Sequence, residues 1–177
     1  MKFNLYRASI AAIAIITSLT SLTASVKAQE TQPLVPLELY WSSQREDNFV
    51  TATLEGKNSA EEAGYGYART EACVFRKQKP GTVPLNLYWS AQRGDNFTTA
   101  TNVGVRSAKE AGYTFARVEG YVFRQQQPGT VPLNLYWSAQ RGDNFTTATS
   151  VGVRSAKEAR YTFARVEGYV FPASQCQ

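Results

Sequence analysis

One short segment gathers most of the side chains that could bind or react. Residues 88–96 read YWSAQRGDN, which places two aromatic rings, a guanidinium, a carboxylate and an amide close together. Such a set suits sugar binding, because an aromatic ring stacks on the C–H face of a sugar and fixed polar groups hydrogen-bond its hydroxyls. Near-copies occur twice more, so the candidate ligand-binding residues are Tyr40, Arg45, Asp47, Asn48, Tyr88, Arg93, Asp95, Asn96, Tyr136, Arg141, Asp143 and Asn144.

The aromatic pair also has a purely structural interpretation. In "VPLNLYWS" the side chains alternate between two faces, as in a strand. Trp89 falls on the face of Leu85 and Leu87, so we expect it in the core. Tyr88 points to the other face, so we expect it to be the exposed ring.

The polar residues of the segment allow a second structural alternative. Asp95 and Asn96 could cap the turn through side chain–backbone hydrogen bonds. Arg93 could pair with Asp95 or with Glu119. At this point a sugar site and a network that fixes the turn remain equally open.

Catalysis has little support in the residue types. The chain contains no histidine, the usual proton shuttle near neutral pH. The one recurring acid, at Asp47, Asp95 and Asp143, would sit in three similar environments, whereas acid–base work needs groups whose pKa values differ. We therefore expect no enzyme. With two cysteines and no histidine, we also expect no metal and no cofactor.

The elements that must position these residues repeat every 48 residues. Val-Pro-Leu begins at positions 35, 83 and 131, and residues 83–123 differ from 131–171 at two positions only. These are Asn102 against Ser150 and Gly112 against Arg160. The pattern predicts one domain of three repeats, 35–82, 83–130 and 131–177, after a linker at 29–34.

Each repeat begins with a predicted hairpin. Residues 83–90 form a strand by their alternation, and the β-branched, aromatic NFTTAT forms the returning strand. Gly94 and Gly142 suit a turn that needs a positive φ. The first repeat has Glu46 there, which predicts a different turn or about 1 kcal/mol of strain.

The second half of each repeat predicts a short helix and more strand. Ser107 and Glu110 have the S-x-x-E spacing of a capping box, and Gly112 suits a helix C-terminus. "YTFARVEGYVF" follows as one or two strands, with Gly120 as a break. The equivalent positions in the other repeats are Ser59/Glu62, Ser155/Glu158, Gly64 and Gly168. The third repeat has Arg160 where Gly112 stands in the second.

The predicted fold is all-β with short helical turns, about four short strands per repeat. A single repeat cannot bury its apolar face, whereas three can close around an axis and remove exposed sheet edges. We expect a pseudo-threefold β-trefoil-like domain, with a β-prism or a short open array as the next alternatives.

The first 28 residues predict a secretory signal peptide, with a basic start, a short apolar run and Ala28 before the cut. Removing them lowers the net charge from +5 to +2 and leaves no basic run, so we expect neither a nucleic-acid partner nor a membrane partner after cleavage. We expect a secreted monomer, extracellular or periplasmic. Export would allow Cys73 and Cys176 to form a disulfide, the alternative being two free thiols.

"PLNLYWSAQRGDNFTTAT…AGYTFARVEGYVF" resembles a repeat family of secreted bacterial proteins of unknown function. Its units run approximately P-L-Y-R-x-Y-N-x-x-x-G-D-H-F-Y-T-T…G-Y-x-x-E-G-x-x-G-Y-V-F. The resemblance implies a three-copy, trefoil-like domain with an accessory binding role beside extracellular hydrolases. The family's histidine after G-D is asparagine here, at Asn48, Asn96 and Asn144, so a role that needs imidazole is unavailable.

Residues and resemblance together lead to one expected function. The protein is expected to be a non-catalytic module that binds extracellular or cell-wall polysaccharide through repeated sites. A structural or protein-interaction domain without a sugar site is the alternative, and a hydrolase is less favoured.

Overall fold

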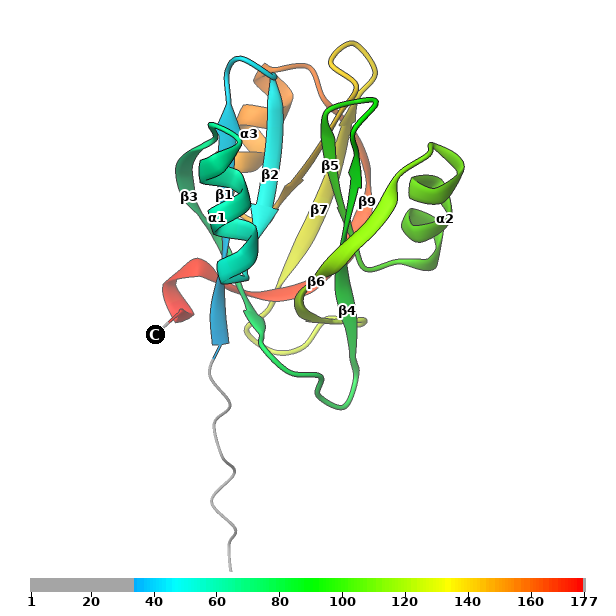
Figure 1. The fold of residues 1–177 in the computed structure, drawn as a ribbon. Helices are drawn as coiled ribbons and strands as arrows, with labels where there is room; N and C mark the ends of the chain where they lie inside the picture. The colour runs from blue at the N-terminus through cyan, green and yellow to red at the C-terminus, as the bar shows by residue number, and fades with distance from the viewer. Residues whose placement is uncertain (1–33, 177) are drawn as a thin grey trace, which may run out of the picture. The chain divides into compact units, whose positions relative to one another are not determined.

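The computed structural model describes residues 34–176, so the expected signal peptide and nearly all of the 29–34 linker lie outside the described residues. The described chain begins with β1 (Leu34–Ser42), β2 (Asp47–Thr51), α1 (Leu54–Glu62) and β3 (Gly66–Phe75). The same order follows in β4 (Thr82–Ser90), β5 (Asp95–Thr99), α2 (Asn102–Glu110) and β6 (Thr114–Phe123). It recurs in β7 (Val131–Ser138), β8 (Asp143–Thr147), α3 (Ser150–Glu158) and β9 (Thr162–Pro172), and the short 3₁₀ helix η1 (Ala173–Gln175) ends the chain (Figure 1).

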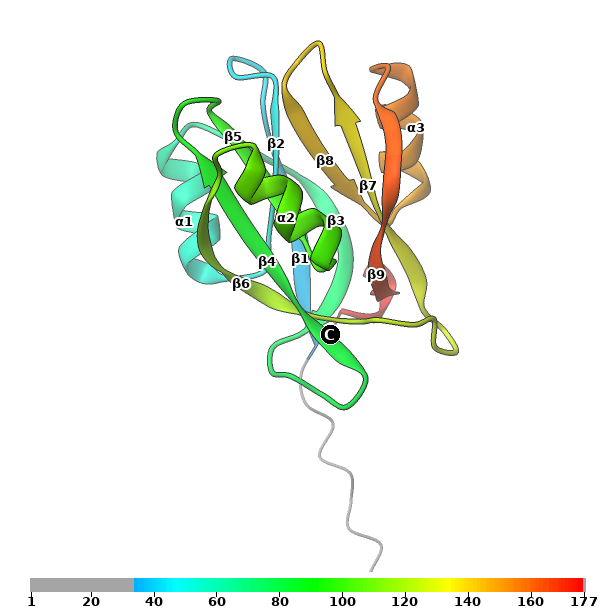
Figure 2. The same cartoon turned by 90° about the vertical axis from the view of Figure 1, so that its right-hand side faces the viewer.

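The strands are antiparallel, and each repeat contributes three of them instead of the expected four. In the second repeat β4 pairs with both β5 and β6, so that Tyr88 lies opposite Phe97 on one side and Phe115 on the other. The first and third repeats keep the same register. The helices lie on the outside of the hairpins of their own repeats (Figures 1 and 2).

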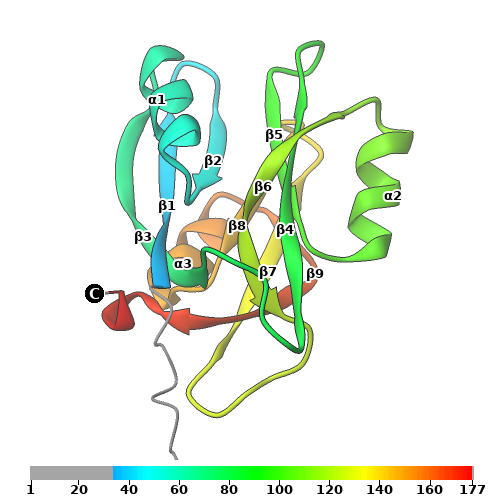
Figure 3. The same cartoon turned by 60° about the horizontal axis from the view of Figure 1, so that its bottom comes forward.

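The repeats join through the ends of their last strands. Pairings connect β3 with β6, β6 with β9, and β3 with β9, so each of the three strands touches both others. Phe75, Phe123 and Phe171 meet there edge to face, with ring centroids 5.3–5.9 Å apart. β9 thus reaches β3, and η1 packs beside it (Figure 3).

A bulge reverses the expected roles of the aromatic pair. The β4–β6 register shifts between Leu87 and Tyr88, and a register shift re-aims the side chains that follow it. Tyr88 is therefore buried at 4% exposure, and Trp89 is only half-buried. The expectation of an exposed Tyr88 and a core Trp89 is wrong. The first repeat behaves alike, with Trp41 36% exposed.

The capping-box prediction is also wrong, because the residue that caps each helix lies six positions before that serine. Thr101 caps α2, its hydroxyl accepting a hydrogen bond from the Gly104 amide at 3.0 Å, while Ser107 lies inside the helix. Thr53 and Thr149 cap α1 and α3 in the same way. Each helix has nine residues, more than two full turns.

The predicted positive-φ positions take that conformation. Gly94, Gly142, Gly64 and Gly112 have φ between 68° and 80°. Glu46 and Arg160, which replace glycine, adopt φ of 52° and 61°. Side chains with a Cβ are strained there by about 1–2 kcal/mol.

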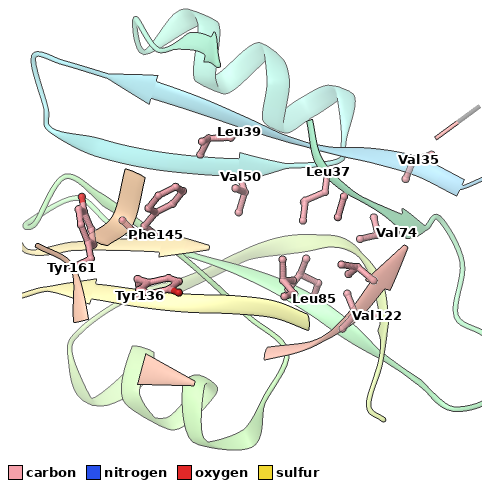
Figure 4. Close-up of a cluster of buried hydrophobic side chains, with 14 residues drawn as sticks. Val35, Leu37, Leu39, Val50, Val74, Leu85, Val122, Tyr136, Phe145 and Tyr161 are labelled. Carbon is pink, nitrogen blue, oxygen red and sulfur yellow. The ribbon is translucent and has the colours of Figure 1, made fainter. Parts of the chain in front are cut away.

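The main apolar core lies between the three hairpins (Figure 4). Leu37, Leu85 and Leu133 are fully buried in it, and Val74 and Val122 pack nearby. β6 runs through Gly120 without a break, because the glycine serves a close approach: a Cβ there would lie 2.6 Å from Cγ2 of Val74.

A disulfide joins Cys73 in β3 to Cys176 after η1, with Cα atoms 5.4 Å apart. The bond links the first repeat covalently to the end of the third. Among residues 34–176 no helix is both long and apolar enough to span a membrane.

Candidate functional site

Three matching pockets lie between neighbouring repeats. The pocket between the first and second repeats has a volume of about 310 Å³, the second–third pocket about 300 Å³, and the third–first pocket about 290 Å³. Each takes one wall from the turn, returning strand and helix of one repeat, and the other wall from the strands of the next. The pockets are therefore products of assembly, and no single repeat contains one.

The first–second pocket shows how these walls are built. Its first wall carries Arg45, whose guanidinium carbon lies 5.9 Å from the centre of the Tyr65 ring. On the opposite side Arg117 reaches back over the Phe49 ring of the first repeat, at 5.7 Å. Half-buried Trp89 completes the lining. The pocket combines aromatic faces with cations, the pairing that cation–π attraction favours.

The other two pockets repeat this composition. In the second–third pocket the same roles fall to Arg93, Tyr113, Phe97, Trp137 and Arg165. In the third–first pocket they fall to Arg141, Tyr161, Phe145, Trp41 and Arg69.

A buried glutamate anchors the strand arginine of each pocket, and sequence reasoning did not identify it as a site residue. Nε of Arg117 contacts Oε1 of Glu119 at 2.7 Å. Oε2 of Glu119 accepts hydrogen bonds from Thr51 at 2.6 Å and Thr53 at 3.1 Å, across the repeat boundary. The recurring R-x-E at 69–71, 117–119 and 165–167 was the available signal.

The turn arginines are the most accessible of the candidate residues. Arg93 pairs with neither Asp95 nor Glu119, so that expectation is wrong; its Nε donates to the Ala111 carbonyl at 3.3 Å. Arg141 pairs with Glu46 at 3.1 Å, because only the first repeat has an acid in this turn. The third–first pocket is therefore less positive than the others.

The candidate tyrosines are not available to a ligand. Tyr40, Tyr88 and Tyr136 are 4–6% exposed and lie in the apolar clusters. Burial, reinforced by the hydrogen bond to Glu38, raises the pKa of Tyr40 to about 12. Half-buried tryptophans occupy the pocket walls where the sequence suggested tyrosine.

The candidate aspartates converge on one buried point. Asp47, Asp95 and Asp143 are each 2% exposed, and one carboxylate oxygen from each lies within 4.8 Å of the other two. The structural alternative, in which the aspartates cap their own turns, is therefore wrong. Each aspartate accepts a hydrogen bond from an asparagine of another repeat.

The asparagines make these bonds between repeats. Nδ2 of Asn48 donates to Oδ2 of Asp143 at 2.7 Å. Asn96 donates to Asp47 at 3.1 Å and Asn144 to Asp95 at 2.9 Å, which completes a cycle. Each asparagine also borders a pocket, so the polar cluster supports the pocket floor.

Tyrosine hydroxyls complete the cluster. Tyr65 donates to Asp47, Tyr113 to Asp95, and Tyr161 to Asp143. Burial raises the pKa of each aspartate to about 7, and the neighbouring aspartates contribute to the rise. Burial and the adjacent carboxyl also raise the pKa of Tyr65 above its usual range.

Comparison with known proteins identifies a family. Neither a curated protein nor a solved structure matches the chain. The sequence pattern of the family described as domain of unknown function DUF5648 matches residues 36–171, which span all three repeats. The chain therefore belongs to the DUF5648 family.

Proposed function

We propose that this protein is a secreted, monomeric, non-catalytic module that binds extracellular or cell-wall carbohydrate in its three inter-repeat pockets. The observation that carries the proposal is the recurrence of one pocket, with a partly exposed tryptophan and an accessible arginine, at every repeat boundary. An open groove of about 300 Å³ is at the lower end of ligand-site sizes and suits one or two sugar units.

The lining has the groups that sugar recognition needs. Half-buried Trp89 supplies a flat apolar face, and Arg45 supplies hydrogen-bond donors at the mouth. Three such sites on one rigid body would act together on a polymer, and avidity of this kind can raise binding by 10²–10⁴-fold over one site.

A binding role suits the pockets better than hydrolysis. Glycoside hydrolysis usually needs two carboxyl groups flanking the scissile bond. The repeated aspartates are buried and face one another, and Glu119 is occupied by Arg117 and by the first repeat. No carboxylate lines the first–second pocket as the structure describes it.

The proposal includes a pseudo-threefold, β-trefoil-like arrangement and export. The cyclic pairing of β3, β6 and β9 and the cyclic asparagine–aspartate bonds support three equivalent repeats. The Cys73–Cys176 disulfide supports an oxidising compartment, where such bonds persist.

A second candidate function rests on exposed aromatics outside the pockets. Tyr67, Phe115 and Phe163 are 51–58% exposed and stand at equivalent places on β3, β6 and β9. Each packs edge to face on a buried tyrosine of its own repeat, which leaves much of the ring facing solvent. Exposed aromatics of this kind favour a protein partner.

A glycan array and a pull-down with insoluble polysaccharides test the proposal. We expect the mature chain to bind, and the Trp41→Ala, Trp89→Ala, Trp137→Ala variant to lose binding while keeping its circular dichroism. The matched control changes Tyr67, Phe115 and Phe163 to Ala and should bind normally. Loss in the control alone would favour the exposed aromatic face, and no binding by the wild type would overturn the sugar proposal.

A further inference from the structure

We propose that Asp47, Asp95 and Asp143 form a binding site for a single hard divalent cation of the Ca²⁺ type. The site lies where the three repeats meet, separate from the pockets proposed to bind sugar. Its function would be to hold the three hairpins together.

The geometry of the carboxylates suits such an ion. One oxygen from each aspartate lies within 4.8 Å of the others. An ion with metal–oxygen distances of about 2.3–2.6 Å can reach oxygens separated in this way, and Ca²⁺ accepts such flexible, all-oxygen ligand sets. Mg²⁺ demands shorter and more regular contacts, which favours the larger ion.

Three carboxyl groups at one buried point need their charge balanced, either by bound protons or by a cation. The direct contacts of the three carboxylates are neutral donors, namely tyrosine hydroxyls, asparagine amides and backbone amides. No ion pair with any of the three is formed within residues 34–176. The guanidiniums of Arg45, Arg93 and Arg141 lie instead over the rings of the cluster tyrosines, each 5.8–6.0 Å from a ring centre.

A second observation points to an absent ligand. Oδ1 of Asp47 is buried and accepts no hydrogen bond, although Oδ2 of the same carboxylate accepts two. The Asp47 carboxylate belongs to the cluster by geometry, because one of its oxygens lies within 4.8 Å of an oxygen of Asp95 and of Asp143. A buried carboxylate oxygen without a partner costs free energy, and a bound cation would remove that cost.

The surrounding residues would hold the ligands in place. Each aspartate accepts a hydroxyl from a tyrosine of its own repeat and an amide from an asparagine of another. Such outer contacts orient ligating carboxylates and commonly contribute 10–100-fold to metal affinity. They also place three tyrosine rings next to the ion, which provides a spectroscopic probe.

The experiment uses the purified mature chain, first stripped with EDTA. Tb³⁺, a Ca²⁺ analogue with oxygen ligands, is titrated in while tyrosine is excited, and calorimetry is run with Ca²⁺ alone. We expect saturable, sensitised Tb³⁺ emission at one ion per chain, displacement by Ca²⁺, and a higher thermal midpoint in Ca²⁺ than in EDTA. Failure of the wild type to bind either ion would overturn the proposal.

Two variants locate the ion. Asp95→Asn keeps the shape of the side chain and should weaken binding by about tenfold or more, because a neutral amide replaces a charged carboxylate ligand. Glu46→Gly removes an exposed acid next to Asp47, restores the residue of the other repeats and should bind as the wild type does. Unchanged binding in folded Asp95→Asn would overturn the site; if that variant does not fold, the wild-type stoichiometry and thermal shift still decide. Glycan binding is scored separately, so either proposal can fail alone.

Discussion

The hydroxyl of Thr51 donates a 2.6 Å hydrogen bond to the carboxylate of Glu119, a residue of the next repeat. Glu167 accepts from Thr99 and Glu71 from Thr147 at the same distance, so the bond recurs at every repeat boundary. Each glutamate ties the end of one hairpin to a strand of the next repeat and also holds a pocket arginine. Pocket shape and domain stability thus depend on the same three carboxylates.

Replacing Glu119 should therefore be costly. Glu119→Ala leaves the buried side of Arg117 without its partner and removes an acceptor from Thr51, and breaking a buried pair typically costs about 3–5 kcal/mol. Urea unfolding followed by tryptophan fluorescence measures the change. Glu110→Ala, on the exposed face of α2, is the control and should stay within about 0.5 kcal/mol. Equal losses of stability in Glu119→Ala and Glu110→Ala would contradict the proposed role of the Glu119 contacts.

Replacing Glu46 with glycine should stabilise the protein. It holds φ at 52°, where glycine is unstrained, and its ion pair with Arg141 is exposed and therefore weak. Glu46→Gly should raise the free energy of unfolding by about 0.5–1 kcal/mol, the relief of strain outweighing the added freedom of the unfolded chain. Gly94→Glu in the second repeat should have the opposite sign. Thermal unfolding of both variants measures the two effects. A midpoint for Glu46→Gly below that of the wild type would be evidence against strain at Glu46.

Gly120 should not tolerate a methyl group. A Cβ there would lie 2.6 Å from Cγ2 of Val74 and 3.1 Å from the Phe75 carbonyl, in the packed region between repeats. Gly120→Ala should destabilise the domain by about 1–3 kcal/mol through overpacking. Gly66→Ala is the matched control, because its nearest contact would be 4.0 Å away and its φ is not positive. Chemical denaturation that shows the same loss for both would argue against the close approach.

The aspartate cluster should make the EDTA-treated protein less stable as pH rises. The folded pKa values are raised to about 7 from an ordinary value near 3.8, so the folded state binds more protons than the unfolded chain in between. The contribution of these three groups to the free energy of unfolding is therefore largest below about pH 4. It decreases as the pH rises to about 7. Urea midpoints across this range in EDTA measure the trend.

The triple variant Asp47→Asn, Asp95→Asn, Asp143→Asn provides the control for pH. It has no carboxyl at the cluster, so its midpoint should change less over the same range. A wild-type profile that rises with pH, or one that the triple variant reproduces, would show that other groups dominate.

The local features were the ones that sequence could predict. Alternation in 83–90, the β-branched NFTTAT and the glycines of the turns gave the hairpins and their positive-φ residues, since these depend on neighbours along the chain. The end of each helix was predicted but its start was not, because Thr101 and Ser107 are both good capping residues and the structure uses the earlier one.

The contacts between repeats were the ones that sequence could not place. The bulge that buries Tyr88 arises from register with β6, a strand that follows after the helix. Asp47, Asp95 and Asp143 converge although they lie 48 and 96 positions apart, and neither residue type nor spacing distinguishes a contact between repeats from a turn cap. The pairings of β3, β6 and β9 bring the three repeats together, and the sequence does not show these pairings.

The division of every pocket between two repeats has a consequence for how such a protein could arise. A single 48-residue unit carries both halves of a pocket on opposite sides, and could complete one only by associating with further copies of itself. Fusion of three copies into one chain turns that concentration-dependent assembly into an intramolecular one. Because each repeat lines two pockets, losing one copy would remove a wall from two of the three.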